Sequence, residues 1–134
     1  MTTILLIGSD VALLEGLSQA LAAAGYAPRI STTMAEGAEL ASAEPPLVAV
    51  VERSLAVREA AVLRLPLAQG GALLLYRPSV DDAPALTPAL QRAVLADLAL
   101  PLERHRLVAL IQRVEERARA TGRGQTPTPE QRAQ

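Results

Sequence analysis

The chain of 134 residues contains no cysteine, no phenylalanine and no tryptophan, and it has a single histidine, His105. Without cysteine there is no disulfide bond, no thiol nucleophile and no cysteine-ligated zinc. One histidine is too few for a histidine-based metal site, and it argues against a Ser–His catalytic triad. We therefore expect neither a metal site nor a bound cofactor.

Long apolar runs and a strong charge imbalance are also absent. The aliphatic run at 4–7 is far shorter than a membrane-spanning segment, and no basic region precedes it as in a signal peptide. A net charge of -1 and an isoelectric point near 5.8 speak against a surface that binds nucleic acid. We expect a cytoplasmic protein that contacts neither membranes nor nucleic acids.

Half of the residues are apolar, and nearly all of these are alanine, leucine or valine. Short aliphatic runs alternate five times with segments of helical character. We predict strands at 3–7, 27–31, 47–51, 72–76 and 97–100, and helices at 10–24, 34–43, 54–67 (interrupted by Pro66), 88–94 and 102–120. This alternation predicts a parallel sheet covered by helices on both faces. Five such units suit a flavodoxin-like α/β three-layer sandwich with strand order 2-1-3-4-5.

The expected helix ends carry recognisable capping residues. Ser9 or Asp10 is placed to cap the first helix, and Gly25 stands where a helix commonly stops. Thr87 precedes Pro88, a pairing typical of a helix start. We assign residues 1–120 to one domain. Residues 121–134 hold glycines and prolines but no large apolar side chain, so we expect a disordered tail or a linker.

The carboxyl ends of the predicted strands carry little reactive chemistry. In open parallel sheets this edge is where ligands bind and catalysis occurs. Here it offers an aspartate, a glutamate, two arginines, a tyrosine and a serine, namely Asp10, Glu52, Arg53, Arg77, Tyr76 and Ser9. This shortage of reactive groups is the most informative feature of the sequence.

Residues 3–119 resemble the receiver domain of two-component response regulators. The resemblance rests on the strand 4–7 with its helix ending at 24–26, on the two prolines before strand 47–51, and on segment 98–102 around Pro101. It implies the flavodoxin-like fold inferred above. It also implies that the peptide bond before Pro101 is cis, as is usual at this position in the family.

The resemblance also identifies the positions at which active receivers hold Mg²⁺ and accept a phosphoryl group. The acidic pair after the first strand is replaced by Gly8 and Ser9, with Asp10 just beyond. The phosphoacceptor aspartate corresponds to Val51, or to Glu52 if Pro46 is an inserted residue. Two further family positions, a Thr or Ser after strand four and a Lys before the proline, correspond to Tyr76 and Leu100.

These replacements remove the chemistry of phosphoryl transfer. That reaction needs a divalent ion to neutralise charge on the phosphoryl oxygens, and Mg²⁺ needs oxygen ligands. We therefore expect a pseudo-receiver that is not an enzyme and that acts as a protein–protein interaction module in bacterial signal transduction. Two alternatives stay open: an N-terminal regulatory domain of a longer regulator, and a small-molecule-binding domain of flavodoxin-like fold.

Three residues at this edge have competing interpretations. Glu52 either imitates a phosphorylated aspartate or is an ordinary surface acid beside Arg53 or Arg77. Arg77 either replaces the metal as counter-charge to Asp10 or Glu52, or points to solvent. Tyr76 either fills the old pocket or points outward as a contact residue.

The resemblance further implies an interaction face made by the fourth helix, the fifth strand and the fifth helix. Its aliphatic side chains would be Leu86, Leu90, Leu98, Val108 and Leu110. An exposed apolar patch of this kind marks an interface. Homodimerisation through this face is a hypothesis, with another protein as the alternative partner.

Overall fold

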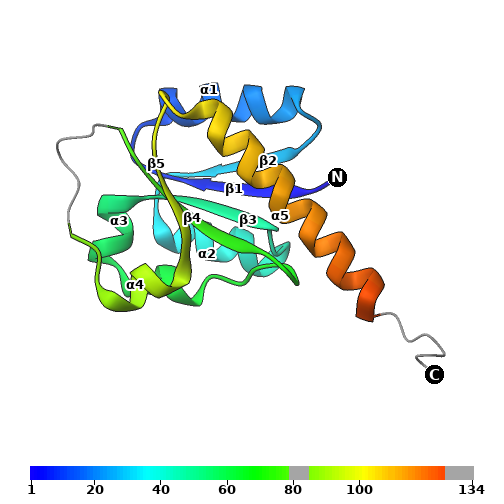
Figure 1. Cartoon of the computed structure of the whole chain (residues 1–134). Helices are drawn as coiled ribbons and strands as arrows, with labels where there is room; N and C mark the ends of the chain where they lie inside the picture. Colours follow the sequence, from blue (N-terminus) through cyan, green and yellow to red (C-terminus); the bar gives the residue numbers. More distant parts are fainter. Residues whose placement is uncertain (79–84, 126–134) are drawn as a thin grey trace.

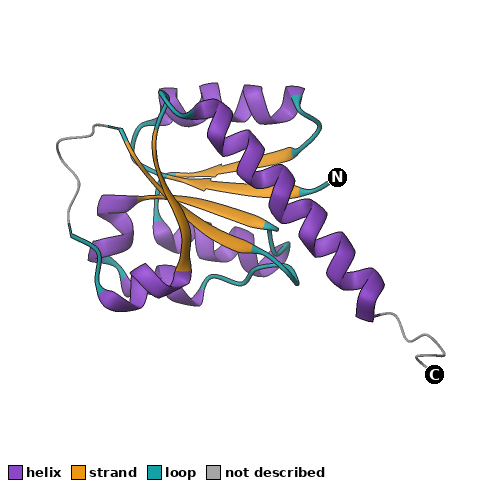
Figure 2. Cartoon of the chain, viewed as in Figure 1, coloured by secondary structure: helices purple, strands orange, loops and turns teal. Residues whose placement is uncertain are grey.

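The computed structural model describes residues 1–78 and 85–125, and it contains the predicted five-stranded parallel sheet (Figure 2). The strand order is β2-β1-β3-β4-β5, which confirms the flavodoxin-like arrangement. The strands are β1 (Thr3–Ile7), β2 (Ala27–Ser31), β3 (Val48–Glu52), β4 (Ala72–Arg77) and β5 (Val94–Ala99). The helices are α1 (Val11–Ala23), α2 (Met34–Ala43), α3 (Arg53–Arg58), the 3-10 helix η1 (Ala60–Arg64), α4 (Pro88–Ala93) and α5 (Arg104–Gln125).

The sheet is the middle of three layers (Figure 1). Helices α1 and α5 cover one face, and α2, α3 and α4 cover the other. Side chains alternate between the faces along each strand, so β1 sends Ile4 and Leu6 toward α1 and α5, and Leu5 and Ile7 toward the opposite layer. Both sets are buried, which explains why the central strands are apolar throughout.

The expected capping residues have their predicted roles. Oδ1 of Asp10 accepts a hydrogen bond from the backbone N–H of Leu13 at 3.1 Å, and Gly25 follows α1 with a φ of 96°. The hydroxyl of Thr87 accepts from the N–H of Leu90 at the start of α4. The Leu100–Pro101 peptide bond is cis, as the resemblance implied.

Several boundaries differ from the sequence-based expectation, most of them by one or two residues, and three differences are larger. Strand β5 begins at Val94, three residues before the predicted start, because Val94 leaves α4 and pairs with Leu73. Helix α5 continues to Gln125, so residues 121–125 are helical rather than part of a tail. The rest of the expected tail, 126–134, lies outside the described residues. The predicted helix 54–67 is split into α3 and η1, and it stops before Leu65, whose extended backbone is favoured by the following Pro66.

Candidate functional site

Glu52 is the only one of the predicted edge residues whose carboxylate joins two neighbouring segments of the described chain. The backbone N–H and the hydroxyl of Ser9 both donate to its Oε1, at 2.8 and 2.9 Å. The hydroxyl of Ser54 donates to its Oε2 at 3.0 Å. Glu52 thus links the loop after β1 to the first turn of α3. The preceding Val51 is fully buried in the opposite layer, so the side chain that reaches this edge from β3 belongs to Glu52.

Tyr76 fills the space beside Glu52. It is the register partner of Glu52 across β3 and β4, and its side chain is only 1% exposed. A β-carbon added to Gly8 would lie 1.8 Å from the Oη atom of Tyr76 and 3.0 Å from its Cζ atom. The hydroxyl end of the tyrosine therefore occupies the place that a side chain at position 8 would need. Of the two interpretations of Tyr76, the structure supports the one in which it fills the pocket.

The Tyr76 hydroxyl lies in an unfavourable environment for ionisation. Burial raises the pKa of this hydroxyl well above its usual value, and the negative charges of Glu52 and Asp10 raise it further. Its oxygen is buried and has no hydrogen-bond partner among residues 1–78 and 85–125. A buried polar group without a hydrogen-bond partner lowers the stability of the fold. The packing of the tyrosine ring has to offset this loss.

Arg77 does not pair with Asp10 or Glu52, which corrects one interpretation of this residue. Its Nε atom lies 3.5 Å from Oδ2 of Asp97, and Arg53 donates a hydrogen bond to the same oxygen. The reason is strand alternation: Arg77 follows Tyr76 and therefore projects to the opposite face, where β5 presents Asp97. The other interpretation, an arginine pointing to solvent, is also wrong, because the side chain is 23% exposed.

Asp10 and Leu100 have structural roles. Asp10 caps α1, as described above. Leu100 is buried in the layer of α1 and α5, and its N–H donates to the carbonyl oxygen of Arg77 at 3.1 Å. Among residues 1–78 and 85–125, no three acidic, histidine or cysteine side chains gather where they could hold a metal ion. The sequence carries a further signal that bears on Leu100. All 13 of its lysine-or-arginine residues are arginines, so the chain has no lysine that could take the role of the family's lysine.

The predicted interaction face is less exposed than expected. Leu90 and Leu98 are 2% and 0% exposed, because each points into one of the two cores, and they are therefore no part of an exposed patch. Leu86, Val108 and Leu110 are partly buried. The large apolar side chain that β5 does expose is Leu95. Whether this face binds a partner stays a prediction.

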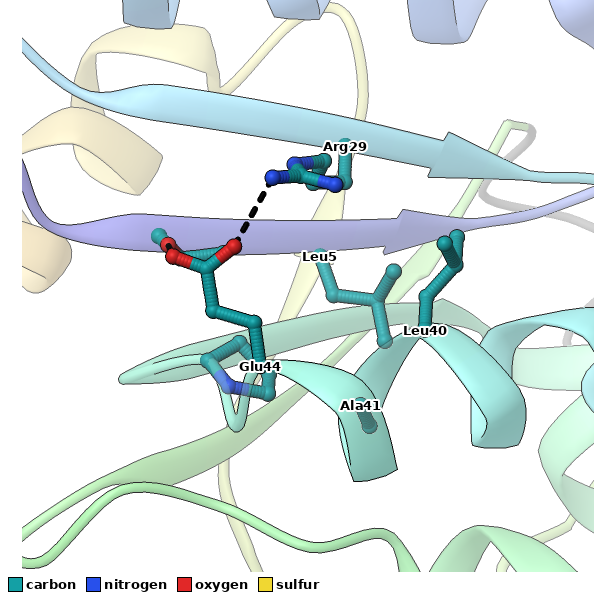
Figure 3. Close-up of a pocket in the computed structure, with 7 residues that line it drawn as sticks. Leu5, Arg29, Leu40, Ala41 and Glu44 are labelled. Carbon is teal, nitrogen blue, oxygen red and sulfur yellow. Dashed lines mark hydrogen bonds and ion pairs between the residues drawn. The ribbon is translucent and has the colours of Figure 1, made fainter.

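Four hollows in the described part of the chain lie away from Glu52. The one shown in Figure 3 has a volume of about 10 Å³, lies at the amino end of the sheet, and is flanked by the 2.8 Å ion pair of Arg29 with Glu44. It has room for roughly one water molecule. Three further clefts have volumes of about 140, 280 and 490 Å³, and none of the four is lined by Glu52 or Tyr76. Within residues 1–78 and 85–125, no helix is both long and apolar enough to cross a membrane.

No protein-family model matches the chain, and no curated protein matches its sequence. Solved structures do match. A response regulator receiver domain from Methylobacillus flagellatus is 14% identical with a TM-score of 0.70, over 85% of this chain and 98% of that one. The N-terminal domain of a response regulator/sensory box/GGDEF 3-domain protein from Carboxydothermus hydrogenoformans is 14% identical with a TM-score of 0.72, over 90% of this chain and 98% of that one.

A third match is a response regulator protein from Burkholderia pseudomallei, whose structure contains a phosphorylated aspartic acid, a calcium ion and citrate. It is 21% identical with a TM-score of 0.68, over 96% of this chain and 76% of that one. These likenesses define the fold class. The chain has the fold of response regulator receiver domains, as the resemblance in its sequence implied.

The contact between position 8 and Tyr76 leads to a first prediction. We expect Gly8→Ala to lower the free energy of unfolding by about 1–3 kcal/mol, because the new methyl group overlaps the buried hydroxyl of Tyr76. In a Tyr76→Ala background the same change should cost little. Urea denaturation of the four variants measures this coupling. Gly16→Ala is the control, since a β-carbon there meets nothing within 4 Å and should be neutral or stabilising. An equal cost of Gly8→Ala in both backgrounds would contradict the contact.

The raised pKa of Tyr76 gives a second prediction. Unfolded Tyr76 loses its proton near pH ~10, whereas folded Tyr76 keeps it, so stability should be full below that pH and fall as the pH rises above it. Tyr76→Phe should remove most of this fall. The test is to measure denaturation midpoints from roughly pH 8 to 11, a range that brackets the ordinary tyrosine pKa. Tyr26→Phe is the matched comparison, because the pKa of Tyr26 is also raised but its hydroxyl has a partner in Glu115. Parallel pH curves for Tyr76→Phe and the unmodified protein would refute the assignment.

Proposed function

We propose that this domain is a pseudo-receiver, a receiver fold that works as a protein–protein interaction and regulatory module in bacterial signal transduction without being phosphorylated. The observation that carries the proposal is the packing of Tyr76 against Gly8 and beside Glu52. In active receivers this edge holds the metal and accepts the phosphoryl group. Here a tyrosine ring fills it, and a glutamate is already hydrogen-bonded within it.

The residues present do not suit the Mg²⁺ ion that active receivers use. Mg²⁺ requires several oxygen ligands in near-octahedral geometry. Gly8 offers no side-chain ligand, Ser9 donates to Glu52, and Asp10 caps α1. Leu100 is buried and apolar where the family has a lysine. These four features support a site without phosphoryl-transfer chemistry, and hence a domain that is not an enzyme.

Glu52 places a hydrogen-bonded carboxyl group at this edge. Ser9 and Ser54 donate hydrogen bonds to this carboxylate, which therefore holds the loop between β1 and α1 close to the start of α3. A carboxylate that replaces a phosphorylated aspartate would keep the domain in one signalling state. This arrangement supports the phosphate-imitating interpretation of Glu52, with Glu52 rather than Val51 at the phosphoacceptor position.

A second candidate is a regulatory domain within a longer regulator. The matching domain of the Carboxydothermus hydrogenoformans protein is the N-terminal domain of a three-domain protein. A domain of this fold thus serves in that protein as one part of a larger chain. Sequencing the gene beyond the codon for Gln134 decides between the two arrangements.

The main proposal predicts no reaction with phosphoryl donors. We expect acetyl phosphate or beryllofluoride with Mg²⁺ to leave the intact mass and the amide NMR spectrum unchanged, because the metal ligands are absent and Tyr76 occupies the site. Glu52→Gln treated in parallel identifies any adduct on Glu52. A phosphoryl adduct on Glu52 or Asp10, or a spectral change throughout the domain, would disprove the pseudo-receiver.

The partner that we propose is a protein bound through the α4–β5–α5 face, and a second copy is one version of it. If the domain dimerises there, sedimentation velocity will show the mass rising from 14.1 kDa toward twice that value as concentration increases. Leu95→Glu should then restore the monomer, since Leu95 is the exposed leucine of β5. A monomer at every concentration would remove the homodimer and leave another protein as the partner.

A further inference from the structure

A cleft of about 280 Å³ lies between the outermost strand and the last helix. Its lining residues are Leu95 of β5 together with Leu110, Arg113, Val114 and Arg117 of α5. Strand β5 forms one edge of the sheet, so no strand of the described chain covers its outer side. Figure 1 shows β5 and α5 at this edge. The volume is below the roughly 300–1,000 Å³ of typical small-molecule pockets.

Leu95 reaches this cleft because the pairing of β4 and β5 is irregular. Leu73 pairs with Val94, and the next residue, Leu74, pairs with Ala96, so Leu95 is skipped. Val94 packs on the layer of α2, α3 and α4, and Ala96 packs on the opposite layer. Bulges of this kind at sheet edges redirect a side chain. Leu95 is 45% exposed as a result. Leu95 thus adds an apolar side chain to an edge strand, where exposed apolar surface favours association.

The two arginines of the cleft form no ion pair within the part of the chain that the structure describes. Elsewhere on α5, Arg106 pairs with Glu103 and Arg119 pairs with Glu115. Arg113 and Arg117 are exposed and have no ion pair within residues 1–78 and 85–125. They stand four residues apart on one helix face, where like charges repel. The cleft lining contains no acidic residue.

We propose that this cleft docks an acidic, aliphatic segment of a partner protein. An aliphatic side chain of that segment covers Leu95 and Leu110, and two of its carboxylates pair with Arg113 and Arg117. Guanidinium groups suit this role because they bind carboxylates through two parallel hydrogen bonds. The inference rests on the proposed function as an interaction module, and it names the chemistry of the partner.

A second copy of the chain fits this cleft less well than a different protein. A two-fold dimer brings the same patch of both copies together. Centred on this cleft, it would place the arginine pair of one copy against the same pair of the other, with no acid in either lining. Charge complementarity therefore favours a partner that supplies the carboxylates.

The test uses isotope-labelled protein and two synthetic amphipathic peptides, one of leucine and glutamate and one with lysine in place of glutamate. We expect the acidic peptide to shift the amide signals of Leu95, Leu110, Arg113 and Arg117, and the basic peptide to leave them unchanged. The double variant Arg113→Glu/Arg117→Glu should reverse the preference, with a change of roughly tenfold or more in each dissociation constant.

The control has the same change in charge at another place on the helix. Arg104→Glu/Arg106→Glu should keep the preference for the acidic peptide. Equal behaviour of the two double variants, or shifts that fall outside the cleft, would overturn the proposal. Neither peptide needs Mg²⁺ or a phosphoryl donor, so a phosphoryl adduct would defeat the pseudo-receiver function without affecting this result. A concentration-dependent dimer that shifts the same signals without peptide would assign the cleft to a second copy and refute it.

Discussion

The burial of the central strands on both faces is the constraint on which the rest of the molecule depends. Strands β1, β3 and β4 lie inside the sheet, and their alternating side chains fill two separate cores. Such strands have no position along their length for a functional group, because any polar side chain there would need a buried partner. Chemistry is thus confined to the residues at the strand ends. This explains why so few residues decide what the domain does.

At those ends, the side chains depend on one another. The ring of Tyr76 fits because residue 8 is a glycine, and Glu52 is positioned by Ser9 of the same loop. Arg77, the next residue of β4, belongs to a different cluster on the other face with Arg53 and Asp97. One carboxylate there joins the start of α3, the end of β4 and the outer strand β5. Both clusters reach the start of α3, the first through Ser54 and the second through Arg53.

Much of the fold could be predicted from the sequence, because continuous apolar runs and helical periodicity are local signals. The strand order followed from the repeated alternation, and the caps at Asp10 and Thr87 followed from residue type. The contacts at the candidate site were harder to predict from the sequence. The ion pair of Arg77 with Asp97 depends on the register of β4 and β5, which a bulge at Leu95 displaces. Burial of Leu90 and Leu98 depends on how α4 and β5 face the cores, which composition does not determine.

The contact between Gly8 and Tyr76 has a consequence for the order in which such a domain could change. A side chain at position 8 needs the space that the tyrosine hydroxyl occupies, so it would force Tyr76 to shift. Replacing Tyr76 by a small residue would also free this space, but it would remove a large buried side chain at a cost of about 3–5 kcal/mol. The packed tyrosine therefore favours one order of substitution, with position 76 changing before position 8 gains a side chain.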